Sequence, residues 1–460
     1  MHAVKFNHNL SAIMVLSVNL LIGFILPCFC PIESCITSLT VTTIVTYLIL
    51  IVIAMPRNEI VFLVLLLLGF YENIFLFNHL IGTIDYHDYH IIIRLENLGF
   101  DGTTDLFYYQ QAFLLFRCVS LGLLLVLLPT RSRIDWSMID ILPEHHTFAI
   151  AGMAMLVLLV HLIQKEGSSI ALLAIGKSLL IYYLMLWLAI KFSRPGLSRM
   201  LIWGMMIVGS FWVTRSRNFA GVMILYYMAF FWNTHFGQNQ NANKFCSRIK
   251  NISIIGVLCL GAFIFVSLYE VYRDNQEKTL SYEALATSSR FGVEGEGGIT
   301  YAIGAHIASL HNDPAAVGIL QDSFYDKLVR SIPGISKGSM QADRYVKQFF
   351  PDIASGGGLA YPLIGEACLY GGFPAVIGMA ILFAVGIRIL VWGATYPLWR
   401  VALLSVMIGC VRSELSLSLF LVVNMSIWVG GIYGLGMILP RARGEALALP
   451  DHTTPTINKI

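Results

Sequence analysis

Residues 371–393 read GGFPAVIGMAILFAVGIRILVWG, an apolar run with a single charged side chain, Arg388. About 20 apolar residues in a helix span the hydrocarbon core of a bilayer, so this run predicts a transmembrane helix. Similar runs recur through the 460 residues, which are 57% hydrophobic and 12% charged. An average soluble domain carries about twice that charge. The composition therefore excludes a soluble enzyme, a nucleic-acid-binding protein and a disordered chain, and it indicates an all-α polytopic membrane protein.

Twelve runs of this kind occur along the chain. The count is eleven if the short neighbouring runs at 199–214 and 218–234 form one span. The lengths of the runs suit single crossings of a bilayer. The predicted spans are residues 10–27, 36–55, 59–77, 107–129, 147–164, 169–190, 199–214, 218–234, 252–270, 371–393, 398–412 and 417–438.

The charges in the short loops predict the orientation, because Lys and Arg are enriched in cytoplasmic loops. If Lys5 lies inside, every loop or tail after an even-numbered span holds at least one basic residue. Both termini are therefore expected in the cytoplasm. The basic residues that support this orientation are Arg57, Arg131, Arg133, Lys191, Arg194, Arg199, Lys244, Arg248, Lys250, Arg400, Arg441 and Arg443.

This topology divides the chain into four parts. Residues 1–270 hold spans one to nine, and residues 271–370 form a large extracytoplasmic loop. Spans ten to twelve follow in 371–438, and 439–460 is a short cytoplasmic tail. Long loops of this size are usually functional, so we expect the loop to form part of a site.

The end of the large loop is apolar but too short and too rich in glycine for a full crossing. We expect a re-entrant helix near 359–370 that leads into span ten. Non-helical backbone is tolerated at membrane depth only inside protein or beside a water-filled cavity. Glu366 is the only acidic residue of this segment. Its carboxylate is either a general base for a sugar hydroxyl or the structural partner of an arginine.

Three arginines lie on the predicted extracytoplasmic side, where the enrichment of basic residues in cytoplasmic loops does not explain them. Arg215 and Arg217 flank a short turn, and Arg412 ends span eleven beside Glu414. An ion pair between Arg412 and Glu414, or a snorkelling side chain, is the structural alternative. Three arginines at one depth favour an anionic ligand, because the planar guanidinium binds phosphate oxygens bidentately and keeps its charge. Such a cluster neutralises a pyrophosphate without a metal ion, so we expect no metal site, no cofactor and activity that survives EDTA.

Other charged residues fall inside predicted spans. Glu72, Arg117 and Lys177 lie in spans three, four and six. A central Arg costs about 2.5–3.5 kcal/mol on insertion scales, so it needs a partner. We expect an interior Glu–Arg or Glu–Lys pair that holds these spans together.

Several short motifs together resemble the Wzy-type polysaccharide repeat-unit polymerases. They are Ser216-Arg217-Asn218, the pattern Gly-x6-Gly-Glu-x4-Gly-Gly from Gly358 to Gly372, and Arg412-x-Glu414. The basic segment 329–339 is similar to a stretch that family members carry before the Gly-Glu motif. The resemblance covers roughly 200–430. Many members have Ser-Pro before Gly-Glu, whereas this chain has Tyr361-Pro362, which leaves no serine hydroxyl at that place.

The resemblance implies a fold like the integral-membrane glycosyltransferases of the GT-C type. It also implies a reaction at the periplasmic face of the bacterial inner membrane. The donor would be a glycan on undecaprenyl diphosphate, and the acceptor a new repeat unit on the same membrane lipid. Block transfer would build an O-antigen-like surface polysaccharide. A chain-length regulator protein is a candidate partner.

Within this resemblance, Arg217 and Arg412 are expected to stabilise the pyrophosphate leaving group, with Arg215 as a third cation. Lys337 and Arg290 are further candidates for binding the donor or acceptor phosphates, and Glu366 is the expected catalytic carboxylate. Two alternatives stay open. A glycan ligase of related fold would use the same outside arginines, and a flippase or exporter would move the lipid-linked saccharide instead.

Overall fold

The structure, a computed structural model, describes residues 8–54, 59–80, 95, 97–128, 203, 205, 222, 224–229, 296–332, 341–351, 361–393 and 397–438. These residues form helices, and none of them lies in a β-strand. Among these described residues, four helices are long and apolar enough to cross a membrane: Asn9–Cys28, Ile32–Ile51, Thr104–Leu127 and Leu363–Trp392. The prediction of a helical membrane protein is thus supported, while the number of spans and the GT-C fold stay predictions.

Seven of the twelve predicted spans coincide with helices of the structure. Of the other five ranges, only residues 203, 205, 222 and 224–229 are described. The helices are α1 (His8–Ile25, followed by the 3-10 turn η1, Leu26–Cys28), α2 (Ile32–Ala54), α3 (Glu59–Leu80), α5 (Thr104–Leu127), α16 (Leu363–Gly393), α17 (Pro397–Arg412) and α18 (Leu415–Ile438).

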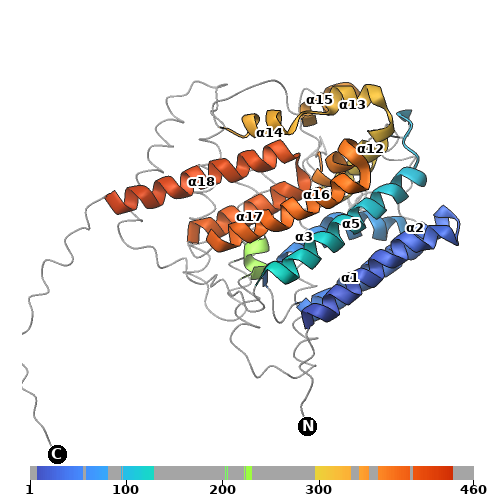
Figure 1. The fold of residues 1–460 in the computed structure, drawn as a ribbon, viewed down its shortest axis with the longest axis horizontal. Helices are drawn as coiled ribbons and strands as arrows, with labels where there is room; N and C mark the ends of the chain where they lie inside the picture. The colour runs from blue at the N-terminus through green and yellow to red at the C-terminus, as the bar shows by residue number, and fades with distance from the viewer. Residues whose placement is uncertain are drawn as a thin grey trace, which may run out of the picture.

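The long helices form a bundle with two distinct ends (Figure 1). At one end, α1 finishes where α16 enters its long segment, and the rings of Phe24 and Phe373 lie 5.4 Å apart. At the other end, Nε of Arg388 on α16 donates to the carbonyl of Leu127 at the close of α5, at 3.1 Å. The short helices within residues 310–349 gather near the first end, which we call the loop end (Figure 1).

Much of the predicted outside loop is helical. Asp313 caps α13 by accepting from the N–H of Ala315, and the hydroxyl of Ser323 caps α14 by accepting from the N–H of Asp326. Such caps satisfy backbone donors that the first turn leaves unpaired. The helices of this region are α12 (Glu296–Ser309), η6 (Leu310–Asn312), α13 (Pro314–Leu320), α14 (Phe324–Arg330) and α15 (Gln341–Phe349).

Helix α12 is buried inside the bundle, although we expected its residues in the loop. It packs against α3, α5 and α16. Its 14 residues make a helix about 21 Å long, too short to cross a hydrocarbon core of about 30 Å. The buried residues are Thr300, Tyr301, Ala302, Ile303, Ala305, His306, Ile307 and Ala308.

A buried ion pair joins the spans of the first half, as expected for Glu72 and Arg117. Nη1 of Arg117 on α5 lies 2.5 Å from Oε2 of Glu72 on α3. Its Nη2 donates to Oδ1 of Asn19 on α1, and the hydroxyl of Tyr47 on α2 donates to Glu72 at 2.8 Å. The pair therefore links four helices. Lys177 lies outside the described residues.

Candidate functional site

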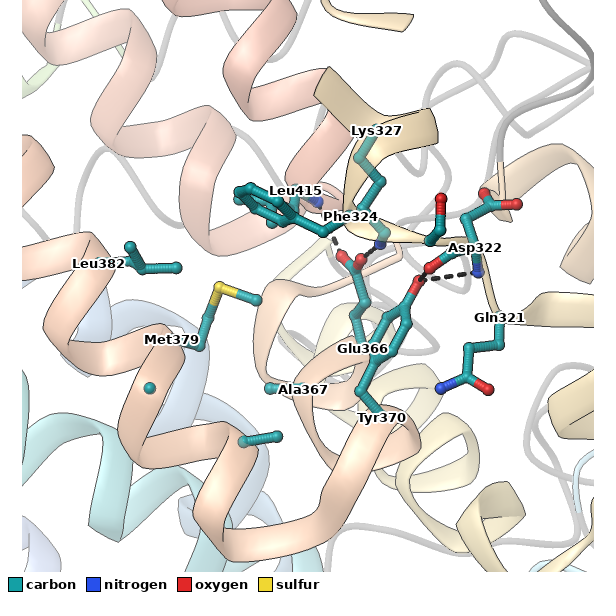
Figure 2. A pocket seen from close by; sticks show the side chains of 13 residues that line it. Gln321, Asp322, Phe324, Lys327, Glu366, Ala367, Tyr370, Met379, Leu382 and Leu415 are labelled. Carbon is teal, nitrogen blue, oxygen red and sulfur yellow. Dashed lines mark hydrogen bonds and ion pairs between the residues drawn. The ribbon is translucent and has the colours of Figure 1, made fainter. Parts of the chain in front are cut away.

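A pocket of about 630 Å³ lies at the loop end, between α14, both parts of α16 and the start of α18. Figure 2 shows Met379 and Leu382 on one side of this pocket and Lys327 and Asp322 on the other. The described residues that line it are Gln321, Asp322, Ser323, Phe324, Lys327, Glu366, Ala367, Tyr370, Ala375, Gly378, Met379, Leu382 and Leu415.

An ion pair between Lys327 and Glu366 forms the polar wall of the pocket. Both side chains are almost fully buried, and they come from α14 and from the first turn of α16. The other oxygen of Glu366, Oε2, accepts the N–H of Leu415 at 2.7 Å. Leu415 is the first residue of α18, so the carboxylate also caps that helix, where negative charge is favourable.

Two further groups hold the Lys327 ammonium. It donates to Oε1 of Gln341 at 2.8 Å, and it sits 4.4 Å from the centre of the Tyr370 ring. Burial disfavours the charged form and lowers the pKa of Lys327 to about 7, although Glu414 and Asp322 act in the opposite direction. The charge on this lysine therefore changes near neutral pH.

Two arginines pair with Asp322, which lines the pocket, although neither arginine is among the described residues that line it. Arg330 of α14 pairs with Asp322, and Nη2 of Arg344 of α15 lies 2.6 Å from its Oδ2. Burial raises the pKa of Asp322, but the hydrogen bonds from the two arginines outweigh burial and hold it below its usual value. Nε of Arg344 has no partner among the described residues. A guanidinium has five N–H donors, so Arg344 keeps a donor for an anion beyond Asp322.

Tyr370 ties α16 to the chain just before α14. Its hydroxyl accepts the N–H of Asp322 and donates to the carbonyl of the same residue, both at 2.9 Å. Nε2 of Gln341 also donates to this hydroxyl at 2.7 Å. These bonds fix Asp322 and Gln341, which in turn position Arg330 and Lys327. The polar wall is thus one connected network.

The other end of the pocket is apolar. It is formed by Ala375, Gly378, Met379 and Leu382, all on the long segment of α16. Leu382 is 53% exposed, so this end is open rather than enclosed. One pocket thus runs from a charged wall at the loop end to an apolar wall on a membrane-spanning helix.

A break in α16 separates the two walls. Gly372 has φ +61° and ψ −145°, a region that side chains rarely allow. A Cβ at Gly372 would also lie 3.1 Å from the hydroxyl of Tyr108 on α5. The break turns the first segment of α16, with Glu366 and Tyr370, relative to the segment that spans the membrane.

The structure places two of the predicted site residues. Glu366 lines the pocket, where its charged partner is Lys327 rather than an arginine. Arg412 is the last residue of α17 and is not among the described residues that line the pocket. Arg215, Arg217, Arg290 and Lys337 lie outside the described residues. Of the predicted cluster of cations, the described residues therefore include only Arg412.

Sequence reasoning missed most of the polar wall. Arg330 lies in the basic segment 329–339, but we gave it no role. Lys327 follows Asp326 in the mixed stretch FYDKLVR, so its charge gave no usable signal along the chain. Asp322 and Arg344 carried no such signal either, since 22 residues separate them along the chain.

Glu414 is a neighbour of this site. Its Oε2 accepts the N–H of Ala342 at 2.9 Å, near the start of α15, and Ser416 donates to its Oε1. The carboxylate thus fixes α15 against the turn between α17 and α18. This holds Gln341 and Arg344 beside the pocket.

Comparisons with family models, with curated proteins and with solved structures give no match to this chain.

Proposed function

We propose that this chain is a membrane glycosyltransferase that polymerises lipid-linked oligosaccharide repeat units, and that the pocket between α14 and α16 binds its substrate. The observation that carries the proposal is the single pocket with a charged wall and an apolar wall. A glycan on undecaprenyl diphosphate has the same division, with an anionic diphosphate next to a long hydrocarbon tail. The donor and acceptor would be two such molecules at the periplasmic face of the inner membrane.

The charged wall suits a diphosphate leaving group. Negative charge develops on the diphosphate oxygens as the glycosidic bond breaks, and cations fixed there stabilise the transition state. Lys327, Arg330 and Arg344 are held in place by carboxylates before any ligand arrives. Preorganised charges of this kind need little rearrangement during the reaction. Arg412, Arg215 and Arg217 stay proposed contributors, as do Lys337 and Arg290.

Glu366 is the proposed catalytic carboxylate. In the empty pocket it is paired with Lys327 and accepts the N–H of Leu415. A carboxylate with two such donors is a weak base. We propose that the diphosphate attracts the Lys327 ammonium, which leaves Oε1 of Glu366 available to the acceptor hydroxyl. The proton of that hydroxyl then passes to Glu366 as the sugar oxygen attacks the donor carbon and the diphosphate departs.

Reconstitution with one defined lipid-linked repeat unit tests the proposal. We expect wild-type proteoliposomes to form multi-unit chains, and Lys327→Gln and Glu366→Gln to reduce the rate at least about 100-fold, as for other lost catalytic charges. Lys347→Gln and Asp343→Asn are matched controls, because they remove the same charges from exposed positions on α15. Wild-type rates in both pocket variants would refute the assignment of the site.

A deletion strain separates the alternatives. Loss of long chains while single units still reach the surface glycolipid supports a polymerase. Loss of every attached unit indicates a ligase, and lipid-linked units that stay inside the cell indicate a flippase or exporter. Either of the last two outcomes would contradict the proposed reaction.

A further inference from the structure

Helix α14 has its polarity reversed relative to a helix that faces water. At 100° per residue, Phe324, Leu328 and Tyr325 fall on one side, and Lys327 and Arg330 fall on the other. The apolar side is the exposed one: Phe324 is 56%, Tyr325 71% and Leu328 40% exposed. On the polar side, Lys327 is 2% exposed, whereas Asp326, which faces away from the apolar residues, is exposed. Such a helix in water would bury its aromatic side chains and expose its lysine.

The position of α14 explains which side faces inward. It packs against α18, and Lys327 reaches the carboxylate of Glu366, which caps the first residue of α18. The helix therefore lies at the level where a predicted span begins. Lys327 points into the pocket, and Tyr325 and Leu328 are exposed without lining it. Phe324 is exposed and also lines the pocket. Ile332, just beyond α14, continues the apolar side and is 46% exposed.

Helix α16 presents an apolar row that ends at the same pocket. Its exposed large residues recur every fourth position, which places them on one face of the helix. They are Ile377, Ile381, Val385 and Ile389, each at least 39% exposed. A span with such a face meets lipid. Leu382 adjoins this row and lines the apolar wall of the pocket, so that wall is continuous with the lipid-facing side of α16.

We propose that α14 lies in the leaflet at the loop end with Phe324, Tyr325, Leu328 and Ile332 against lipid, and that the pocket opens sideways into that leaflet between α14 and α16. The occupant of the exposed face is bilayer lipid. Continuity with the lipid-facing row of α16 favours lipid over a partner protein. Aromatic side chains also prefer this depth, and an amphipathic helix with its charges turned inward suits an interface.

A sideways opening has a direct consequence for substrate entry. A lipid-tailed anion can bring its head group to Lys327 while its tail stays among the side chains of α16 and the surrounding lipid. Its hydrocarbon chain then never crosses water, which avoids the unfavourable exposure of its CH₂ groups. The proposed contact of α14 with lipid, which we call its lipid seating, does not depend on which group the enzyme transfers.

Depth-dependent quenching tests the lipid seating. A fluorescent amino acid is introduced by amber suppression at Tyr325 or at Leu328 of the full chain in proteoliposomes. We expect at least threefold stronger quenching by a lipid with a nitroxide on its acyl chain than by aqueous iodide. The same label at Lys347, exposed on α15, should show the reverse order. Stronger quenching by iodide at Tyr325 and Leu328, or no quenching by either agent, would overturn the proposal.

A second variant tests the opening itself. A Cβ at Gly378 would meet nothing within 4 Å, and Gly378 lines the apolar wall. Gly378→Leu should weaken binding of a polyprenyl diphosphate at least tenfold and leave binding of a short-chain diphosphate unchanged. Gly386→Leu, also in open space on α16, is the control. Equal effects on the two probes would refute the opening. If wild-type protein binds neither diphosphate, the proposed function fails, while the quenching result still decides the seating of α14.

Discussion

Lys327 is the residue on which the chemistry of the pocket depends most. Its ammonium contacts the carboxylate of Glu366, the amide oxygen of Gln341 and the ring of Tyr370, so groups from α15 and α16 converge on one side chain from α14. A buried lysine keeps its charge only when such partners offset the loss of hydration. In this pocket the partners of Lys327 only partly offset the loss of hydration, because its pKa is lowered to about 7.

The first prediction concerns pH. Lys327 is mostly protonated below pH 7 and mostly neutral above it, so binding of an anion should weaken as pH rises. A diphosphate esterified at both ends keeps its charge in this range, so the change reports on the protein. We expect about a tenfold loss of affinity for such a lipid between pH 6 and pH 8 if only the charged lysine binds it.

Lys327→Arg provides the matched variant, because arginine stays charged through this range. Its affinity for the same lipid should be nearly constant from pH 6 to pH 8 in a detergent binding assay. If the arginine variant keeps the full tenfold dependence, another group is responsible and the role of Lys327 as the titrating cation is refuted.

At the scale of the element, the break in α16 is the decisive feature. The first segment carries Glu366 and Tyr370, and the second carries the apolar wall. A straight helix could not present both to one pocket in this way, because the break at Gly371 and Gly372 changes the direction of the chain. The positive φ of Gly372 is what makes glycine necessary there.

The second prediction is that Gly372→Ala destabilises the protein and impairs the site. The strained φ costs about 1–3 kcal/mol, and the added Cβ presses on the hydroxyl of Tyr108. We expect a lower Tm in detergent and weaker binding of a lipid diphosphate. Gly386→Ala in the same helix has open space and should be neutral or slightly stabilising. A Tm for Gly372→Ala equal to that of the control would contradict the strain argument.

At the scale of the whole molecule, the ion pair between Glu72 and Arg117 connects α1, α2, α3 and α5 through Asn19 and Tyr47. The first half of the bundle therefore has a polar centre among apolar helices. Removal of one partner leaves the other charge buried and unpaired, which typically costs about 3–5 kcal/mol. The pair specifies how these helices fit together.

The third prediction follows from that pair. Arg117→Met should lower the Tm in detergent strongly, because Glu72 then has no cation among its described partners. The double variant Arg117→Met with Glu72→Leu should recover much of the loss, since no buried charge remains. A double variant as unstable as Arg117→Met alone would show that packing, rather than the charge, accounts for the effect.

The sequence predicted the described long helices of the bundle because hydropathy is a local property. The run at 107–129 became α5 at Thr104–Leu127, and the run at 417–438 became α18 at Leu415–Ile438. The pairing of Glu72 with Arg117 was also predictable, because a charge inside a span needs a partner and few were available. Helix α12 was missed because its 14 residues are too few to register as a crossing.

The amino-acid sequence by itself determined that this is a helical membrane protein, which ranges hold its described long helices, and that Glu366 lies in the segment before span ten. Only the tertiary structure decided that Lys327 faces Glu366, that Arg330 and Arg344 share Asp322, and that charged and apolar walls meet in one pocket. The physical reason is the separation along the chain of the residues that interact. Bilayer insertion depends on about 20 consecutive residues, whereas these contacts join side chains that come together only when α14 and α15 pack against α16 and α18.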